Sequence, residues 1–290
     1  MNTYVIYNKK SNNGAGAQGA FKIKEIWKTK ELIYKEVNEF ESFKELFDSL
    51  NADDEVVVCG GDGTLNYLVN EVDSDSVQNK IYYYPTGTGN DFWNDIGKNA
   101  DDGPALINEY LVNLPTVIVN GMRKKFINGI GYGIDGYCCE VGDELRAKND
   151  GKPINYTSIA IKGLLFHYKP TNAKVTVDGE EYTFEKAWLA PTMNGRFYGG
   201  GMMATPDQDR LNKERTVTVM VMNGAGKMKT LMAFPTIFKG EHVKKTDIVT
   251  VIKGKSVKVE FDRPVALQID GETVLGVTEY RVASAANRGL

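Results

Sequence analysis

The run Gly60-Gly61-Asp62-Gly63-Thr64 combines residue types that can bind a phosphate. It follows the apolar residues 56–59 and precedes a stretch in which apolar side chains recur with helical spacing. Glycine lets a backbone approach a phosphate closely, and a helix N-terminus offers unpaired N–H groups and the positive end of its dipole. Thr64 adds a hydroxyl that can cap the helix. The run therefore predicts a phosphate-binding loop, with a strand-turn-helix corner shaped by glycine as the alternative.

Asp62 stands out in this run because a carboxylate inside a phosphate-binding loop repels its ligand. The repulsion is relieved when a divalent cation lies between the two charges, or when the carboxylate accepts a proton or hydrogen bonds. We therefore expect Mg²⁺-linked nucleotide chemistry at this loop, with Mg²⁺ bridging the phosphates through Asp62.

A second loop repeats this composition after the strand predicted at residues 80–84. Two such loops on neighbouring strands converge, since the carboxyl ends of parallel strands lie at one edge of a sheet. Taken alone, the second loop is better explained as an N-capped helix start. The residues of interest in it are Gly87, Thr88, Gly89, Asn90 and Asp91.

A third run, Gly14-Ala15-Gly16-Ala17-Gln18-Gly19, has the spacing of a dinucleotide-binding fingerprint, with Glu36 and Glu39 about twenty residues downstream. However, residues 8–13 separate it from the end of the first strand, whereas the fingerprint needs its glycines within the strand-to-helix turn. We therefore interpret it as a polar loop near the phosphates. The sequence contains no G-x-x-x-x-G-K-S/T motif, which excludes a P-loop.

Alternating strand and helix patterns in the first half of the chain must position these loops. Short β-branched or aromatic runs predict strands at residues 3–7, 32–37, 56–59 and 80–84. Between them, apolar side chains recur with the helical period. This order predicts an α/β domain with a doubly wound, mostly parallel sheet. Ligands of that architecture bind beyond the carboxyl ends of the strands, which here are Tyr7, Cys59 and Tyr84.

Hairpin signals dominate from residue 116 onward. Asn120-Gly121 and Asp178-Gly179 each separate two strand-like runs, as the turns of two-residue hairpins do. Together with later strand patterns they predict a β-rich, mostly antiparallel second domain. We therefore divide the chain into a nucleotide-binding α/β domain at residues 1–115 and a β-rich domain at 116–277.

Composition narrows the class of protein. The 290 residues are 42% hydrophobic, and 35 Lys and Arg against 38 Asp and Glu leave a net charge of −3. No basic field is available for a nucleic acid, and no apolar run reaches the roughly 20 residues of a membrane span. The N-terminus does not resemble a signal peptide, so we expect a cytoplasmic protein that binds no nucleic acid. Its three cysteines and two histidines show neither a disulfide framework nor zinc spacing.

Later motifs complete a pattern with the glycine loops. The segment Leu267-Gln268-Ile269-Asp270-Gly271-Glu272 comes last, after the glycine-rich residues 194–202 and the triplet Gly240-Glu241-His242. In order and spacing across nearly the whole chain, the combination resembles the diacylglycerol kinase catalytic-domain family, specifically its bacterial soluble lipid kinases.

The resemblance implies an N-terminal nucleotide-binding domain and a C-terminal β-sandwich-like domain, with residues 278–290 returning to the first. It implies a kinase that uses ATP and Mg²⁺ to transfer the γ-phosphoryl group to a lipid hydroxyl, with diacylglycerol as the first acceptor to test. Such an enzyme would meet its lipid at the membrane surface through transient, peripheral contact. The sequence leaves a homodimer open.

The resemblance also assigns roles to residues. Asp270 or Glu272 would supply the base that accepts the proton of the lipid hydroxyl, and Asp62 completes the catalytic set. A plain hairpin turn is the alternative explanation of Asp270-Gly271. The nucleotide would contact Asn8, Ser11, Gly14, Gly60, Gly61, Asp62, Gly63, Thr64, Leu65, Asn66, Gly87, Thr88, Asn90 and Asp91.

Two departures from the family's pattern bear on the site. The first loop of the family usually reads Asn-Pro-x-Ser-Gly, whereas Asn8-Lys9-Lys10-Ser11-Asn12 stands here, so the fixed geometry of proline is lost. An Asp-Gly pair that supplies a bound Mg²⁺ in the family is replaced by Asn212-Lys213. An amide brings no charge and the lysine opposes a dication, so we expect a weakened or absent metal site. The candidate ligands are Asp209, Asn212 and Glu214.

The acceptor side offers one compositional signal, because seven of the nine methionines lie between positions 193 and 232. Their flexible thioether side chains suit a groove for acyl chains, and core filling explains them equally well. Several lysines follow and could touch anionic headgroups, although scattered lysines on exposed strands are the simpler interpretation. They are Lys239, Lys244, Lys245, Lys253, Lys255 and Lys258.

Two other functions stay open. An NAD kinase-like enzyme shares the loop at 60–64 by family resemblance, although its usual Asn-Asn-Glu motif is replaced here by Asn90-Asp91-Phe92. A nucleotide- or lipid-binding regulator without turnover would account for the altered first loop and for Asn212-Lys213.

Overall fold

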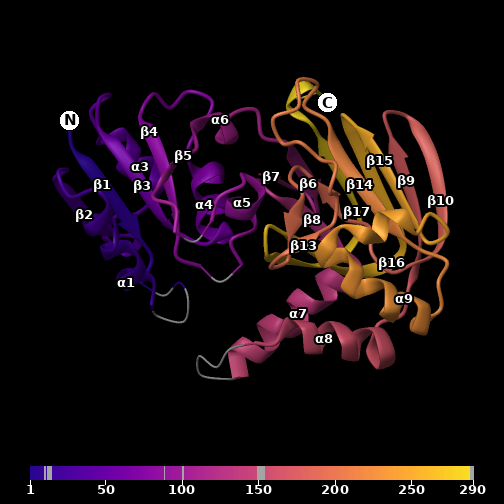
Figure 1. Cartoon of the computed structure of the whole chain (residues 1–290). Coiled ribbons are helices and arrows are strands. Elements are labelled where there is room, and N and C mark those ends of the chain that lie inside the picture. The colour runs from indigo at the N-terminus through magenta and orange to yellow at the C-terminus, as the bar shows by residue number, and fades with distance from the viewer. Residues whose placement is uncertain (10, 12–14, 88, 100, 149–153, 288–290) are drawn as a thin grey trace. The chain divides into compact units, whose positions relative to one another are not determined.

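The computed structural model consists of two compact units, Met1–Leu114 and Pro115–Leu290 (Figure 1). It describes residues 1–9, 11, 15–87, 89–99, 101–148 and 154–287. Each unit has a sheet of its own, parallel for the most part in the first and antiparallel in the second.

The first unit contains a five-stranded sheet in the order β2-β1-β3-β4-β5 within the described residues. Neighbouring strands from β2 to β4 are parallel, and only β5 runs antiparallel, at the edge beside β4. This confirms the predicted α/β fold with a mostly parallel sheet. The strands are β1 (Thr3–Tyr7), β2 (Leu32–Glu36), β3 (Glu55–Gly60), β4 (Lys80–Pro85) and β5 (Ala105–Leu106).

The core of the first unit centres on β3, which is buried at every position. A strand with both faces buried reads as a continuous apolar run, and Val56, Val57 and Val58 have no exposed surface. The helical segments are α1 (Gly16–Phe21), α2 (Ile23–Ile26), η2 (Val37–Glu39), α3 (Phe43–Asp48), α4 (Asp62–Glu71), α5 (Asp91–Asp95) and α6 (Asn108–Leu111).

The second unit is built on a ten-stranded sheet, in which the order β15-β14-β11-β8-β16-β17-β6-β7 is extended by β9 beside β16 and β10 beside β9. Its strand pairs are antiparallel, which confirms the predicted β-sandwich-like fold class. The strands are β6 (Thr116–Val119), β7 (Met122–Lys125), β8 (Gly129–Tyr132), β9 (Thr171–Val177), β10 (Glu180–Ala187), β11 (Thr192–Met193), β14 (Val217–Met222), β15 (Val249–Gly254), β16 (Ser256–Ile269) and β17 (Glu272–Ala283). A separate pair is formed by β12 (Phe197–Tyr198) and β13 (Met202–Met203).

Turn chemistry accounts for the hairpins of this sheet. In Asn120-Gly121, φ is 47° and 77°, and in Asp178-Gly179 it is 50° and 91°. A two-residue turn that matches the strand twist needs positive φ at both central residues, which Asn-Gly and Asp-Gly tolerate best. The same geometry recurs at Asp270-Gly271, with φ of 47° and 96°, between β16 and β17. Asp270 therefore lies in a hairpin turn.

The helical segments of the second unit include one that the sequence patterns do not predict, α7 (Ile134–Lys148). Two of its glycines weaken the helical signal but are required by packing. A Cβ on Gly136 would lie 2.0 Å from the carbonyl oxygen of Ala266, and one on Gly142 would lie 2.6 Å from the ring of Tyr156. The other segments are α8 (Tyr156–Lys162), η3 (Gly163–His167), α9 (Lys227–Ala233), η4 (Phe234–Lys239), η5 (Glu241–Lys244) and η6 (Ala285–Asn287).

Residues 278–283, at the start of the segment predicted to return to the first unit, form part of a strand of the second unit. They belong to β17, which pairs with β16 along its length and with β6 through Arg281 opposite Ile118. These ladder hydrogen bonds hold the end of the chain in the second unit. Separately, no helix in the described part of the chain is both long and apolar enough to cross a bilayer.

Candidate active site

Two glycine loops of the first unit are joined at the carboxyl ends of β3 and β4. The carbonyl oxygen of Gly60 accepts hydrogen bonds from the backbone N–H groups of Thr86, at 2.9 Å, and Gly87, at 3.2 Å. It also accepts the buried hydroxyl of Tyr83 at 2.9 Å. The convergence predicted from strand order is therefore present in the fold.

Glycine is required where the loops meet. A Cβ on Gly87 would lie 2.6 Å from the Cα of Gly61, and a Cβ on Gly60 would lie 2.3 Å from the Thr64 hydroxyl oxygen. Both distances are shorter than van der Waals contact permits, and the clashing atoms at Gly61 are backbone. The small residues of both motifs are thus needed for the loops to pack together.

Asp62 connects the loop after β3 with the helix that follows the loop after β4. Its Oδ2 accepts the backbone N–H of Asp91 and its Oδ1 that of Phe92, each at 2.9 Å. The carboxylate therefore satisfies N–H groups at the start of α5, which a helix cannot satisfy internally. Both oxygens take part in this contact, so Asp62 positions the two loops.

The loop after β1 joins the same cluster. The Ser11 hydroxyl donates to the carbonyl oxygen of Asn8 at 2.7 Å and lies 3.3 Å from the Thr86 hydroxyl. A Cβ on Gly16 would meet Asn8 at 2.2 Å, and one on Gly19 would meet Thr86 at 2.7 Å. These glycines let α1 pack on the neighbouring loops, which explains them without a dinucleotide turn.

The remaining nucleotide candidates divide by burial. Leu65 is fully buried in the core, and Asn66 is 5% exposed. Asn90 adopts left-handed backbone geometry, with φ of 48°, and its amide donates to the carbonyl of Gly87 at 2.9 Å. Gly14 and Thr88 lie outside the described residues.

A polyphosphate fits this arrangement. The helix α4 spans ten residues from Asp62, and its N-cap residue Gly61 belongs to the joined loops. Among the described residues, a Cβ on Gly61 would touch only the Gly87 Cα, at 3.5 Å. Open backbone at a helix N-terminus is a general anion-binding arrangement.

In the second unit, three backbone N–H groups hold the carboxylate of Asp270. They belong to Ile127, at 2.6 Å, and to Asn128 and Gly129, both at 2.9 Å. Three donors from consecutive residues hold the carboxylate in one orientation. Glu272, two residues later at the start of β17, is exposed. Of the two predicted bases, Glu272 is thus the one whose carboxylate is available to a substrate.

In the candidate metal loop, residues 209–216, the side-chain amide of Asn212 bonds to the surrounding backbone. Asn212 Nδ2 donates to the carbonyl oxygens of Asp209, at 2.6 Å, and Thr216, at 3.1 Å. Its Oδ1 accepts the Thr216 backbone N–H at 2.8 Å. Because a backbone N–H only donates and a carbonyl only accepts, these partners fix the orientation of the amide. The amide nitrogen thus donates to two carbonyl oxygens that would otherwise be available as ligands of a cation.

The other metal candidates do not complete a donor set. Asp209 Oδ1 accepts the Leu211 backbone N–H at 2.9 Å, and the described residues contain no group of three or more His, Cys, Asp or Glu that could hold a metal ion. Asp209, Asn212 and Glu214 thus do not form such a group, and the amide nitrogen of Asn212 turns a donor toward two carbonyl oxygens.

Two buried polar residues, Arg210 and Asn194, support the segment 127–129 that Asp270 holds. Neither belongs to a motif named above. Arg210 is 7% exposed and donates to the Ile127 carbonyl at 3.0 Å and to the Asn128 side-chain oxygen at 3.1 Å. Asn194 also donates to the Ile127 carbonyl, at 3.0 Å. The sequence offers no local signal for this role, because Arg210 stands in a mostly polar stretch and its partner Ile127 lies 83 positions away.

Asp135, at the start of α7, is a buried carboxylate that the sequence patterns also miss. It is 8% exposed, and a Cβ on Gly131 would lie 2.4 Å from its Oδ2. Burial raises the pKa of the carboxyl to about 6. A glycine opposite the carboxylate thus leaves room for an ionisable group inside the second unit.

The methionine cluster divides between the two explanations. Met193, Met220 and Met222 are fully buried, as core filling requires, whereas Met228 and Met232 are 63% and 68% exposed. Met203 is partly exposed, so the two on α9 are the most exposed methionines of the cluster.

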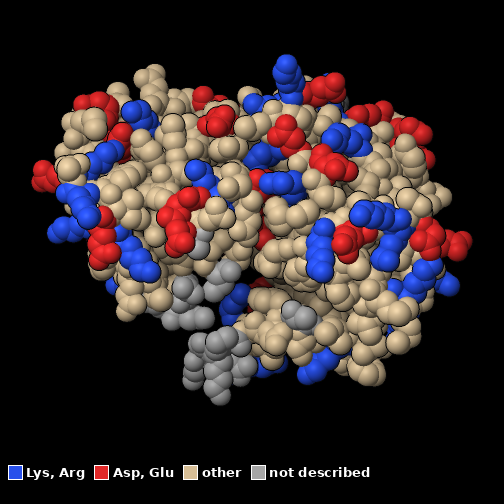
Figure 2. Space-filling view, viewed as in Figure 1, with Lys and Arg blue, Asp and Glu red and all other residues tan. Residues whose placement is uncertain are grey.

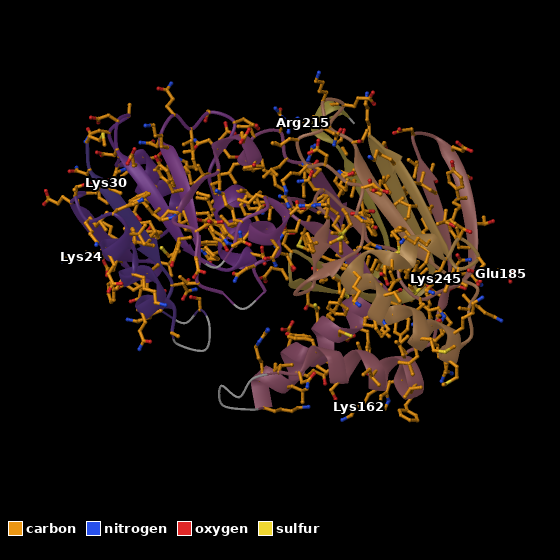
Figure 3. The ribbon with its side chains drawn as sticks, viewed as in Figure 1. Lys24, Lys30, Lys162, Glu185, Arg215 and Lys245 are labelled. Atoms are coloured by element: carbon orange, nitrogen blue, oxygen red, sulfur yellow. The ribbon has the colours of Figure 1, made fainter. Side chains whose placement is uncertain are left out.

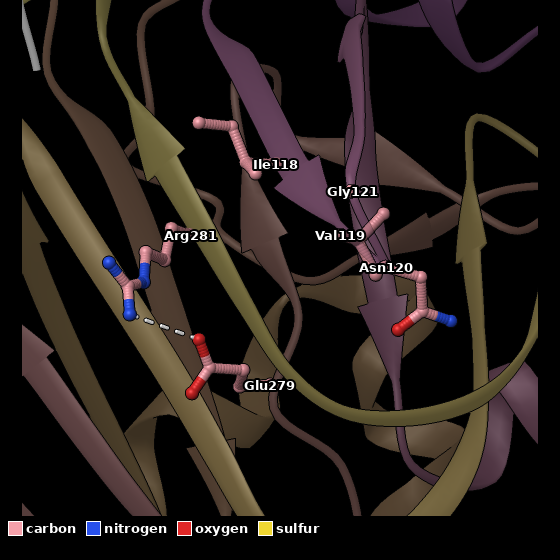
Figure 4. A pocket seen from close by; sticks show the side chains of 6 residues that line it. All are labelled: Ile118, Val119, Asn120, Gly121, Glu279 and Arg281. Atoms are coloured by element: carbon pink, nitrogen blue, oxygen red, sulfur yellow. Dashed lines mark hydrogen bonds and ion pairs between the residues drawn. The ribbon is translucent and has the colours of Figure 1, made fainter.

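A pocket on the second unit contains none of the predicted site residues (Figure 4). It is formed by the β6–β7 turn and by β17, where Arg281 donates to Glu279 at 3.1 Å. Its lining residues are Ile118, Val119, Asn120, Gly121, Glu279 and Arg281.

A parallel sheet with joined glycine loops, followed by an antiparallel β-sandwich-like unit, defines a class of kinases. Residues 2–116 match the family model described as diacylglycerol kinase catalytic domain, and residues 128–284 match the one described as YegS C-terminal NAD kinase beta sandwich-like domain. The chain belongs to the diacylglycerol kinase catalytic-domain family.

Named relatives agree with this membership. A protein of Mycobacterium tuberculosis named "Diacylglycerol kinase" is 28% identical over 215 residues, which cover 71% of this chain and 67% of that one. A Bacillus subtilis protein named "Putative lipid kinase YtlR" is 27% identical over 249 residues, covering 79% and 77%. The crystal structure of a diacylglycerol kinase from Bacillus anthracis has the same fold, with a TM-score of 0.65, 21% identity and coverage of 98% and 95%.

Proposed function

We propose that the protein is an ATP-dependent lipid kinase that phosphorylates the hydroxyl of diacylglycerol. The observation that carries the proposal is the close approach of Gly61 and Gly87 at the N-terminus of α4, which presents backbone to a polyphosphate. The names of the relatives in Mycobacterium tuberculosis and Bacillus subtilis support a lipid acceptor. The lipid would be met at a membrane surface.

The first unit binds and orients the nucleotide in this proposal. Backbone N–H groups of residues 61–63 hold its phosphates. Ser11, whose hydroxyl lies 3.3 Å from that of Thr86, would contact them from the neighbouring loop. ATP supplies the transferable γ-phosphoryl group. Asp62 keeps α5 and the loop after β4 in register with α4, so that the donors are ordered before the ligand arrives. Divalent metal would enter with the nucleotide phosphates, since the described residues offer no cluster of their own.

The second unit supplies the base. Glu272 accepts the proton of the acceptor hydroxyl while the new oxygen–phosphorus bond forms and the bond to the bridging oxygen of ADP breaks. Asp270 positions the turn that carries Glu272 through its bonds to residues 127–129. Glu272 is therefore the proposed catalytic residue and Asp270 a positioning residue.

Radiolabelled ATP tests the proposal. The protein is incubated with mixed micelles that contain diacylglycerol, phosphatidylglycerol, ceramide or sphingosine, and in a parallel reaction with NAD. We expect label in the diacylglycerol product and none in NADP. Label in NADP alone would replace the lipid kinase with a soluble-substrate kinase. ATP binding without transfer to any acceptor would indicate a regulator without turnover.

A further inference from the structure

The joined glycine loops carry negative charge of their own. Residues 60–66 and 85–91 contain two carboxylates, Asp62 and Asp91, and no lysine or arginine. A nucleoside triphosphate adds several negative charges at the same place. The backbone N–H groups and the dipole of a helix N-terminus supply only partial positive charge. A full positive charge from another segment would therefore strengthen the binding of the phosphates.

The basic residues of the first unit are all lysines, since residues 1–114 contain no arginine. On the face shown in Figure 2, blue and red atoms are interspersed over this unit without a broad basic field. Lys24 and Lys30 lie at the outer side of the unit (Figure 3), and Lys30 bonds to Glu55, the first residue of β3. The glycine loop follows the other end of β3, so Lys30 is remote from the phosphates.

Lys9 lies on a loop that does reach the site. Ser11, two residues later, places its hydroxyl 3.3 Å from the hydroxyl of Thr86 in the joined loops. The preceding strand β1 pairs with β3, with Tyr7 opposite Cys59. Lys9 therefore leaves the sheet next to the strand that leads into the glycine loop at 60–64.

Glu36 binds the ammonium group of Lys9. Lys9 Nζ lies 2.5 Å from Glu36 Oε2, and Glu36 Oε1 accepts the side-chain amide of Asn38 at 3.1 Å. Glu36 ends β2 and is 6% exposed, whereas the Lys9 side chain is 59% exposed. The hydrogen bond and the charge of Glu36 raise the pKa of Lys9, so the lysine stays cationic. The carboxylate that a dinucleotide fingerprint would offer to a ribose is thus engaged by a lysine.

This ion pair can exchange partners. The strand β1 lies between β2 and β3, and neighbouring strands are about 4.8 Å apart, so Lys9 starts between Glu36 and the glycine loop. An ion pair with an exposed lysine contributes little to stability. Lysine has a flexible stem and three donors, which makes it a common ligand of phosphate. A polyphosphate carries more charge than one carboxylate and competes effectively for the ammonium group.

We propose that Lys9 leaves Glu36 to bind the phosphates of the nucleotide and supplies the positive charge that the glycine loops lack. Glu36 is then a counter-ion that competes with the nucleotide for Lys9. The lysine would come from the loop after β1, since the sequence has no P-loop motif to provide one. The inference rests on the proposed function, because it requires the phosphates to bind beside Gly61.

Titration calorimetry with the full chain tests the role of Lys9. Lys9→Ala weakens the binding of both ATP and inorganic tripolyphosphate by about tenfold, because a charged contact to phosphate is lost. Lys9→Arg retains most of the affinity. Equal ATP affinity in the wild type and Lys9→Ala would overturn the proposal. So would a loss of ATP affinity with unchanged tripolyphosphate affinity, since the contact would then be to the nucleoside.

Glu36→Gln should change ATP affinity in the opposite direction. The amide keeps an oxygen for Asn38 and releases Lys9, so ATP binds about threefold more tightly or better. In the Lys9→Ala background the same substitution loses most of this effect, because there is no ammonium group to release. Weaker ATP binding in Glu36→Gln at an unchanged melting temperature would overturn the competition.

Matched controls come from an exposed ion pair on α3. Lys44 Nζ lies 2.5 Å from the Asp48 carboxylate, and both side chains are more than 60% exposed. Lys44→Ala and Asp48→Asn make the same changes of charge as the two site variants and leave ATP affinity unchanged. Equal effects in control and site variants would refute the proposal, because net charge would then explain them.

Nuclear magnetic resonance of the wild type observes the contact directly. The ¹³Cε resonance of Lys9, assigned by its loss in Lys9→Arg, shifts when tripolyphosphate is added. An unshifted resonance at saturating tripolyphosphate would refute the contact.

Binding and turnover together separate this inference from the kinase proposal. ATP binding that depends on Lys9, without phosphorylation of any acceptor, retains the inference and rejects the kinase. Phosphorylation of diacylglycerol by Lys9→Ala at the wild-type rate under limiting ATP retains the kinase and rejects the inference.

Discussion

The Asp62 carboxylate at the start of α4 accepts the backbone N–H of Asp91 at the start of α5, over 2.9 Å and across 29 positions of the chain. Its other oxygen accepts the N–H of Phe92. The position of Asp62 in a phosphate-binding motif indicates metal binding. In the structure, its carboxylate joins the N-termini of α4 and α5. This side chain adds to the backbone hydrogen bonds by which the Gly60 carbonyl joins the two glycine loops.

Asp62→Asn is expected to destabilise the first unit and to weaken ATP binding together. An amide keeps one acceptor oxygen and presents an NH₂ group to a backbone N–H, so the free energy of unfolding falls by about 1–3 kcal/mol. Urea unfolding and ATP titration measure the two effects. Glu31→Gln, at an exposed position, serves as the charge-matched control. Unchanged stability with a loss of Mg²⁺ dependence alone would instead support a metal-bridging role.

Gly87→Ala is expected to separate the two glycine loops. The new Cβ would lie 2.6 Å from the Gly61 Cα, and a backbone atom cannot rotate away. We expect a loss of about 1–3 kcal/mol in unfolding free energy, with ATP affinity reduced because the loops no longer share one geometry. Gly226→Ala has open space around its Cβ and should leave both quantities unchanged. Wild-type ATP affinity in Gly87→Ala would show that the loop contact is unimportant for binding.

The two carboxylates of the β16–β17 turn should behave differently when each is replaced by its amide. Glu272→Gln lowers the turnover number by about 10²-fold or more without changing the melting temperature, because it removes only the proposed base. Asp270→Asn lowers stability, since its three backbone N–H donors lose a charged acceptor. Turnover on diacylglycerol and thermal melting distinguish the variants. Full activity in Glu272→Gln would exclude it as the base.

The amide of Asn212 should make the loop at 209–216 independent of cations. Chelation with EDTA is expected to leave the wild-type melting temperature unchanged. In Asn212→Asp, a carboxylate faces the carbonyl oxygens of Asp209 and Thr216 in place of an NH₂ donor. The melting temperature of this variant should fall in EDTA and recover with Mg²⁺, because oxygen donors alone then line the loop. A wild-type melting temperature that drops in EDTA would reveal a metal site.

Asp135 should make stability depend on pH. Burial raises the pKa of its carboxyl to about 6 in the folded protein, compared with about 3.9 in an unfolded chain. Between these values the folded state binds more protons than the unfolded state, so this group lowers stability as pH rises from about 4 to about 6. Asp135→Asn removes that contribution.

The stability of the Asp135→Asn variant should therefore rise relative to that of the wild type as pH increases. We expect the difference in unfolding free energy between the two proteins to shift in the variant's favour by about 1–3 kcal/mol between about pH 4 and about pH 7. Urea unfolding of both proteins at the two pH values measures it. A difference independent of pH would mean that the carboxyl does not titrate in this window.

The sequence by itself determined the features that depend on neighbours along the chain. The buried run at β3 and the alternation of strand and helix predicted the parallel sheet, because each element's periodicity is local. Asn120-Gly121 and Asp178-Gly179 predicted hairpins, since positive φ is a property of the turn residues themselves. Motif order was enough to indicate the kinase family.

Only the tertiary structure decided what the charged and polar side chains of the motifs do. Asp62 meets its partners 29 and 30 positions away, and Asp270 meets its partners 141 to 143 positions away. Such contacts depend on which loops the strand order brings together, and no local pattern encodes them. The same holds for Gly136, because only a residue without a Cβ lets α7 approach Ala266 this closely. Residue type limited the chemistry available, and long-range packing determined which atoms remain free for it.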